Sequence, residues 1–334
     1  MKDFILNLQR FADPVVESLN KTTSEGLSAE NKVYYEKYLI DNAKPNLVHS
    51  QFGQKRSVPK HGGKTVEFRK YSAFEKAAKL QEGITPAGKS LSVSTVTATL
   101  EQYGDYVAIT DVVDMTAIDD NLVEATELLG DQAGLTLDSI PREVMNGGTN
   151  VLYAGGAEGR VMLTDGITVA DVKRAATILK AANAKKINGS YVGIIHPYVS
   201  HDLTSDPAWI DAHKYSATEE IFEGEIGKPY GVRFVETSEA KVFKSAGSSD
   251  ANDFIGGEDD GVADVFSTLI LGADAYGCIE HENGNLKHIF KNFGSGGTSD
   301  PLDQRATAGW KAYQTAVRLV EDNMVRIESL ATAN

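Results

Sequence analysis

One run of residues has the types and spacing of a phosphate-binding loop. Gly83-Ile84-Thr85-Pro86-Ala87-Gly88-Lys89-Ser90 satisfies the pattern G-x-x-x-x-G-K-[ST] at every position. A working P-loop needs a buried strand before it and a helix after it, so that backbone N–H groups and the helix N-terminus face the phosphates. Here the preceding residues are polar and basic, and the following ones alternate as in a strand. A nucleotide-binding enzyme that uses Gly83 to Ser90 is therefore the disfavoured alternative.

A second group of residues raises the question of a metal site. His196, His201, Asp202 and Asp206 lie close together in the sequence, but their spacing matches no compact metal-binding motif. The chain has no G-x-S-x-G nucleophile elbow, and its single cysteine, Cys278, has no recognisable catalytic setting. We therefore expect no catalytic, cofactor-binding or metal-binding residues, and a protein that is not an enzyme.

The composition predicts a globular protein. A chain of 334 residues with 41% hydrophobic content can bury a large core, and its length suggests about two domains. The net charge of −14 argues against general nucleic-acid binding, which relies on Lys and Arg to neutralise phosphates. The apolar run in residues 1–12 is too short to cross a bilayer and is interrupted by Asp3 and Arg10, so we expect neither a signal peptide nor a membrane span.

Two neighbouring stretches carry opposite charge. From Ser50 to Ser90 there are nine Lys/Arg and three Glu, whereas from Leu91 to Val172 there are fourteen Asp/Glu and two Arg. Because like charges crowded together repel one another, this segregation favours contact between the basic stretch and an acidic surface elsewhere. Identical copies of the chain would supply such a surface, so the pattern predicts self-assembly.

The first third of the chain is expected to form an arm and a projection. In the arm, a helix begins after Ser28 and ends before Pro45. Lys64 to Arg69 and Leu91 to Leu100 alternate as strands do, and about twenty mostly polar, basic residues separate them. This arrangement predicts a long two-stranded projection instead of a compact hairpin.

A long amphipathic helix is expected next. Apolar residues recur every three or four positions from Ile118 to Val144, acidic residues crowd the first turns, and Asn146-Gly147-Gly148 supplies a stop signal. Roughly 26 residues at 1.5 Å each give a length of about 40 Å. Pro141 predicts a kink. Such a helix would act as a spine for other elements.

From Gly166 the pattern changes to alternating helices and strands. Thr168 to Asp171 resembles a capping box, and Pro197 suits the first position of a helix. A final strand from Trp310 to Val320, which Met324 to Ile327 continue, should return to an earlier sheet. The other expected strands are Tyr191 to His196, Val232 to Glu236, Val265 to Leu271 and Leu286 to Phe290.

Several stretches resemble the major capsid proteins of tailed bacteriophages with the Hong Kong 97 type fold. Together with the order of elements, they extend the resemblance over nearly the whole chain, although Arg10 stands where an apolar residue is expected. The stretches are 6–12, 83–86, 96–104, 192–197 and 309–311.

The resemblance implies an α+β, HK97-like capsid fold in five parts. These are an N-terminal arm (1–49), an extended loop with flanking peripheral-domain strands (50–110), a peripheral domain with the spine helix (111–165), an α/β axial domain (166–305) and a returning peripheral-domain strand (306–334).

The resemblance also implies a structural subunit that self-assembles into pentamers and hexamers of an icosahedral phage head around double-stranded DNA. Its implied partners are further copies of itself, portal, scaffolding and decoration proteins, and packaged DNA through weak non-specific contact. No membrane and no cofactor is implied, and the location is the virion capsid, assembled in the host cytoplasm. The lysine–asparagine crosslinking of the prototype matches no residue here.

Within that framework the opposed charges give a specific expectation. Lys70, Lys76 and Lys79 on the projection should contact acidic groups on the spine helix of a neighbouring subunit. The acidic groups are Asp119, Glu124 and Asp131.

Nucleotide titration separates the two interpretations of the 83–90 loop. We expect no measurable ATP or GTP binding to the wild-type protein and no change in Lys89→Ala, because the loop lacks the strand and helix of a P-loop. Saturable binding that Lys89→Ala abolishes, measured by isothermal titration calorimetry, would favour the enzyme instead.

Overall fold

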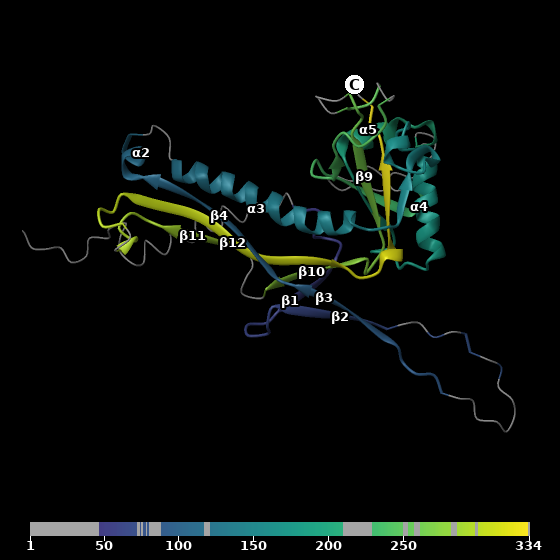
Figure 1. The fold of residues 1–334 in the computed structure, drawn as a ribbon, viewed down its shortest axis with the longest axis horizontal. Helices are drawn as coiled ribbons and strands as arrows, with labels where there is room; N and C mark the ends of the chain where they lie inside the picture. The colour runs from purple at the N-terminus through teal and green to yellow at the C-terminus, as the bar shows by residue number, and fades with distance from the viewer. Residues whose placement is uncertain are drawn as a thin grey trace, which may run out of the picture.

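A computed structural model describes residues 47–71, 74, 76–77, 79, 88–116, 121–209, 229–249, 253–256, 261–281, 286–297 and 300–332. These residues form an α+β fold in which a long helix connects two sheets and an extended hairpin projects from one of them (Figure 1). The arm helix expected after Ser28 lies outside the described residues. No helix among the described residues has the length and apolar character needed to cross a membrane.

The first sheet is organised around β12, which has 14 residues. One edge of β12 pairs antiparallel with β4, and its other edge pairs first with β11 and then with β10, beside which β1 runs parallel. The predicted return of Trp310 to an earlier sheet is therefore confirmed. β1 and β4 lie in the 50–110 region where flanking strands were expected without bounds, whereas β10 was not predicted. The strands are β1 (Gln54–Val58), β4 (Glu101–Thr110), β10 (Tyr276–His281), β11 (Lys287–Lys291) and β12 (Arg305–Arg318).

The predicted spine is α3 (Asn121–Asn146), which runs along this sheet and includes Pro141 (Figure 1). Its apolar stripe of Leu129, Ala133 and Leu137 packs against alternate residues of β12, Ala308, Trp310 and Ala312. A short helix, α2 (Asp111–Thr116), precedes it. Because β12 alternates and α3 has a 3.6-residue period, each presents one apolar face to the other.

Hydrogen bonds fix the position of α3 along the sheet. The Trp310 Nε1–H group donates to Gln132 Oε1 at 3.1 Å, and Gln132 Nε2 donates to Asp105 Oδ2 at 2.8 Å. The bond from Gln132 and one from the Tyr106 backbone N–H lower the pKa of Asp105. One glutamine thus connects the helix with both β4 and β12.

The second sheet is buried on both faces. It has the order β5-β13-β9-β6-β7, with β8 also paired to β9, and every residue of β9 is buried. Helices α4 (Val169–Ala181) and α5 (Pro197–Ser205) contribute to its core. The strands are β5 (Val151–Tyr153), β6 (Tyr191–Ile195), β7 (Val232–Glu236), β8 (Val242–Phe243), β9 (Val265–Leu271) and β13 (Met324–Ser329).

Local signals in this half are confirmed. Thr168 and Asp171 form the reciprocal capping box at the start of α4, and Pro197 is the first residue of α5. Asn188 and Gly189 both have positive φ, 48° and 84°, in the turn before β6. Four short 3-10 helices complete the described structure: η3 (Ala154–Gly156), η4 (Arg160–Met162), η5 (Pro229–Gly231) and η7 (Glu321–Asn323).

The expectation that Met324 to Ile327 continue the preceding strand is wrong. The turn η7 separates β12 from β13, and β13 enters the second sheet between β5 and β9. Two charged side chains are buried in β13: Glu328 accepts hydrogen bonds of 2.6 and 2.7 Å from Arg160, and Arg326 donates to the carbonyl of Asn146. Strand alternation predicted the strand, but only these long-range contacts select its sheet.

The C-terminal end of α3 is held to the second half by further ion pairs. Arg142 donates to the Glu239 backbone carbonyl at 2.8 Å, and Lys241 Nζ lies 2.8 Å from Glu143 Oε2. Partial burial raises the pKa of Glu143. The hydrogen bonds and positive charges of Lys241 and Arg142 together lower this pKa by more, so the net shift is downward. These pairs, with Asn146 and Arg326, make the spine continuous with the second sheet.

A buried polar group fastens the segment before β1 to the same helix. His49 Nδ1 lies 2.5 Å from Asp138 Oδ2, the His49 backbone N–H donates to Asp138 Oδ1 at 2.7 Å, and both side chains are 1% exposed. The Tyr276 hydroxyl donates to the His49 carbonyl. His49 thus joins the segment before β1 to α3, through Asp138, and to β10, through Tyr276.

We expect Asp138→Ala to lower the free energy of unfolding by about 3–5 kcal/mol, because it removes one partner of a buried polar pair and leaves the other unsatisfied. Chemical denaturation of the purified protein measures this. Asp131→Ala, at an exposed position of the same helix, is the control and should change stability by less than about 0.5 kcal/mol. Equal effects of the two substitutions would contradict the proposed importance of the buried pair.

A second expectation concerns acid. A carboxyl group whose pKa is lowered by folding stabilises the folded protein at any pH above its ordinary pKa, which is 4.5 for Glu143. This contribution is lost as the pH falls through the lower pKa of the folded state. The thermal midpoint of the wild-type protein should therefore fall as the pH is lowered below about 4.5. Glu143→Gln should show a smaller fall, and Glu158→Gln, at an exposed position, the wild-type fall. Identical pH profiles for wild type and Glu143→Gln would exclude this role of the pair with Lys241.

Candidate inter-subunit surface

The projection is a two-stranded antiparallel ribbon that extends away from the rest of the subunit (Figure 1). Strands β2 (Thr65–Tyr71) and β3 (Val93–Thr99) pair from Thr65–Thr99 to Tyr71–Val93, as predicted. Its base is anchored, because Phe68 and Ala98 are buried with Val58, Leu100 and Ile279. Arg56 also stacks on the Phe68 ring at 4.7 Å from its centroid.

Beyond this base the ribbon is exposed. Tyr71, Phe74 and Leu91 are 60%, 58% and 67% exposed, and Val93 is 45% exposed. A lone two-stranded ribbon has marginal stability in water, and large apolar side chains on it gain free energy when another surface covers them. The ribbon therefore has the properties of a docking element.

The three predicted lysines lie on this ribbon or directly beyond it. Lys70 is in β2, and Lys70, Lys76 and Lys79 are all exposed. Residues 83–87 of the P-loop match lie outside the described residues, but Gly88 to Ser90 lead into strand β3 without an intervening helix. The structural context that a phosphate-binding loop requires on its C-terminal side is therefore missing.

The predicted acidic residues lie on the spine. Glu124 and Asp131 are exposed on α3, whereas Asp119 lies outside the described residues. In the part of the chain that the structure describes, none of these five charged side chains forms an ion pair or a hydrogen bond. The fold does not bring the lysines and carboxylates together within a subunit, and their contact between subunits stays a prediction.

Sequence reasoning missed an apolar surface at the free end of the spine. On the short helix α2, Val112, Val113 and Met115 are 60%, 45% and 76% exposed, and Leu128 on α3 is 68% exposed. The sequence signal for this surface was the run Val112-Val113-Asp114-Met115. A helix of six residues is too short to place all three of its apolar side chains on one buried face. Exposed apolar residues gathered at one end of an element mark an interaction surface.

The histidine and aspartate cluster has a structural role. Asp206 accepts a hydrogen bond of 3.0 Å from the Val169 backbone N–H at the start of α4, and Asp202 accepts from Thr332. His196 caps α5 and packs against Phe266, and burial lowers its pKa. Among the described residues, no three His, Cys, Asp or Glu side chains are grouped as a metal site would require.

Comparisons with known proteins agree with this architecture. Residues 139–293 match the family model described as phage capsid protein. The capsid of Ralstonia phage GP4 is similar with a TM-score of 0.65 at 15% identity, over 86% of this chain and 89% of that chain. The cyanophage Pam1 capsid is similar with a TM-score of 0.64 at 15% identity, over 88% and 93%. No curated protein sequence matches the chain.

The capsid of the cyanophage P-SCSP1u has the same arrangement, with a TM-score of 0.64 at 14% identity, over 86% of this chain and 89% of that chain. Each of these three likenesses covers 86% or more of this chain. The prediction of an HK97-like capsid fold, made from the order of elements and a few short stretches, is confirmed.

Proposed function

We propose that this chain, a structural phage capsid protein, assembles as pentamers and hexamers into an icosahedral head around double-stranded DNA. The observation that carries the proposal is the exposed ribbon β2–β3, which combines basic and large apolar side chains that a single subunit leaves in water. Each contact between subunits can be modest, because a closed shell repeats it by symmetry.

In this proposal the ribbon of one subunit lies over the spine of the next. Its lysines would meet Glu124 and Asp131, together with Asp119, and its apolar residues would cover exposed side chains such as Leu128 and Leu135. Opposite charges fix the register of such a contact, while the apolar area supplies most of its free energy. The acidic side of the spine supports this pairing.

The five-part division of the chain at 49, 110, 165 and 305 remains part of this proposal. So do the partners beyond the chain itself, namely portal, scaffolding and decoration proteins and weakly held DNA, and assembly in the host cytoplasm before the protein resides in the virion. The returning segment 306–334 contributes strands to both sheets, since β12 pairs with β4 and β13 pairs with β9.

We expect the purified wild-type protein to form uniform closed shells in negative-stain electron microscopy. The triple variant Lys70→Glu, Lys76→Glu, Lys79→Glu should remain as folded subunits or small oligomers, because it places like charges at the contact. Sedimentation velocity quantifies the loss of shells, which we expect to be at least about tenfold.

The matched control is Arg174→Glu, Lys180→Glu, Lys185→Glu, which changes the net charge equally at exposed positions on and just after α4. It should assemble as the wild type does. Normal shells from the Lys70, Lys76 and Lys79 variant would disprove only the charge contact and would leave the shell function standing. A wild-type protein that never closes into shells would contradict the proposed function itself.

A further inference from the structure

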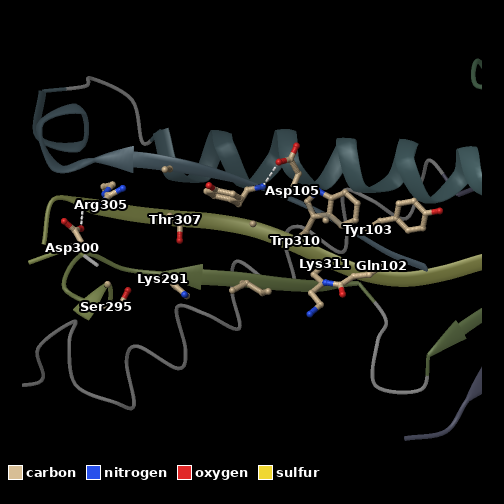
Figure 2. A pocket seen from close by; sticks show the side chains of 16 residues that line it. Gln102, Tyr103, Asp105, Lys291, Ser295, Asp300, Arg305, Thr307, Trp310 and Lys311 are labelled. Carbon is tan, nitrogen blue, oxygen red and sulfur yellow. Dashed lines mark hydrogen bonds between the residues drawn. The ribbon is translucent and has the colours of Figure 1, made fainter. Parts of the chain in front are cut away.

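One face of the first sheet is covered at one end only, where the base of the ribbon packs beside Tyr313 and Val317 of β12. No described element covers the rest of this face, which β4, β11 and the first half of β12 form. Helix α3 packs on the face that presents Trp310, while Lys311, the next residue of β12, points to the opposite side (Figure 2). The alternation continues along the strands, so that Lys287, Ile289 and Lys291 of β11 share this open face with Lys311. The two faces of one sheet therefore differ in their surroundings.

Two adjoining hollows form a groove on this open face. Their volumes are about 980 and 560 Å³, and both are lined by Gln102, Ile289 and Lys311. Figure 2 shows the larger hollow, with Lys291 and Arg305 toward its far end. The smaller hollow reaches the base of the ribbon. The cationic side chains that line the groove are Lys60, Lys64, Lys287, Lys291, Arg305 and Lys311.

The charge of the groove is poorly balanced. Lys287 and Lys311 are directly opposed in the register of β11 and β12, an arrangement that destabilises an antiparallel pair unless an anion lies between the charges. Of the two carboxylates that line the larger hollow, Asp105 accepts a bond from Gln132 of α3, and Asp300 accepts a bond from the Arg305 backbone N–H. Within the described residues, no ion pair joins the five lysines of the groove to a carboxylate.

Apolar surface lies between these cations. Tyr106 is 70% exposed and Ile289 is 44% exposed, and the Lys311 Nζ atom lies 5.2 Å from the centroid of the Tyr313 ring. An extended peptide presents side chains alternately, so its carboxylates could reach the lysines while its apolar residues cover Tyr106 and Ile289. The groove thus combines features that suit a peptide of mixed character.

We propose that this groove binds a short acidic peptide segment, with apolar residues between its carboxylates, from a separate protein. Charge complementarity carries the assignment: the groove is cationic on a chain whose net charge is −14. That overall charge repels a long polyanion such as a nucleic acid, whereas a short segment meets mainly the local cations. The inference goes beyond the proposed shell function and adds a partner to it.

Three segments of a second copy fit the groove less well. The ribbon of a neighbouring subunit is basic and would be repelled. The acidic surface of α3 lies on the other side of the same sheet. If α3 of one copy entered the groove of another, the subunits would stack face to back, and they would not form a single closed layer. Residues 1–46 carry seven acidic and six basic residues, which gives them little net charge to offer.

Fluorescence anisotropy tests the proposal. The probe is a labelled peptide of roughly twelve residues in which Glu alternates with Leu and Ala. A peptide with Gln in place of Glu and a single-stranded oligonucleotide of equal charge are the comparisons. We expect the acidic peptide alone to bind, with affinity that falls as salt is added. Lys287→Glu, Lys311→Glu should weaken binding at least about tenfold, and Lys180→Glu, Lys185→Glu should leave it unchanged.

Three outcomes would overturn the proposal: equal or tighter binding of the oligonucleotide, unchanged binding to the Lys287 and Lys311 variant, or tighter binding of a peptide with the sequence of residues 217–226. That stretch of the chain carries four Glu among apolar residues, so its tighter binding would assign the groove to a second copy. Circular dichroism confirms that each variant is folded. Because the groove lies within one subunit, the titration uses both shells and unassembled subunits. A failure of assembly is thereby distinguished from a failure of binding.

Discussion

The structure depends on the packing of one apolar helical stripe against one long strand. Leu129, Ala133 and Leu137 of α3 meet Ala308, Trp310 and Ala312 of β12, and small residues on the strand let the helix approach closely. β12 in turn pairs with β4, β10 and β11, so the entire first sheet is positioned by this contact. At the other end of the helix, Met145 is fully buried with Ile194 and Leu269 of the second sheet. The spine therefore carries mechanical continuity from one half of the subunit to the other.

Polar groups make this continuity specific. Apolar stripes alone tolerate sliding, whereas Gln132, Asp138 and Asn146 each accept or donate at a defined position along the helix. Asp138 fixes the segment before β1, and Asn146 receives the guanidinium of Arg326 from the second sheet. In the proposed shell, such a fixed internal geometry would be favourable, because small errors in angle accumulate around a closed surface.

Charge is distributed by layer as well as by sequence. Glu124 and Asp131, which belong to the acidic stretch 91–172, are exposed on α3. The face of the first sheet that points away from α3 carries Lys287, Lys291 and Lys311. Part of the basic character therefore lies in residues far from the 50–90 stretch in sequence. The two sides of the first sheet offer different chemistry to whatever approaches them.

Local patterns in the sequence determine much of this protein. The 3.6-residue periodicity predicted α3, and the alternation of Thr and Val residues predicted β3. The capping box at Thr168 and the proline at position 197 marked the starts of α4 and α5. Each of these features depends only on neighbours within a few residues. Tertiary structure alone decided that β13 leaves β12 for the second sheet, that Asp138 meets His49, and that Lys287 and Lys311 become neighbours. These contacts join residues 24 to 89 positions apart. Their formation depends on loop closure and on burial across the whole chain, which no local pattern encodes.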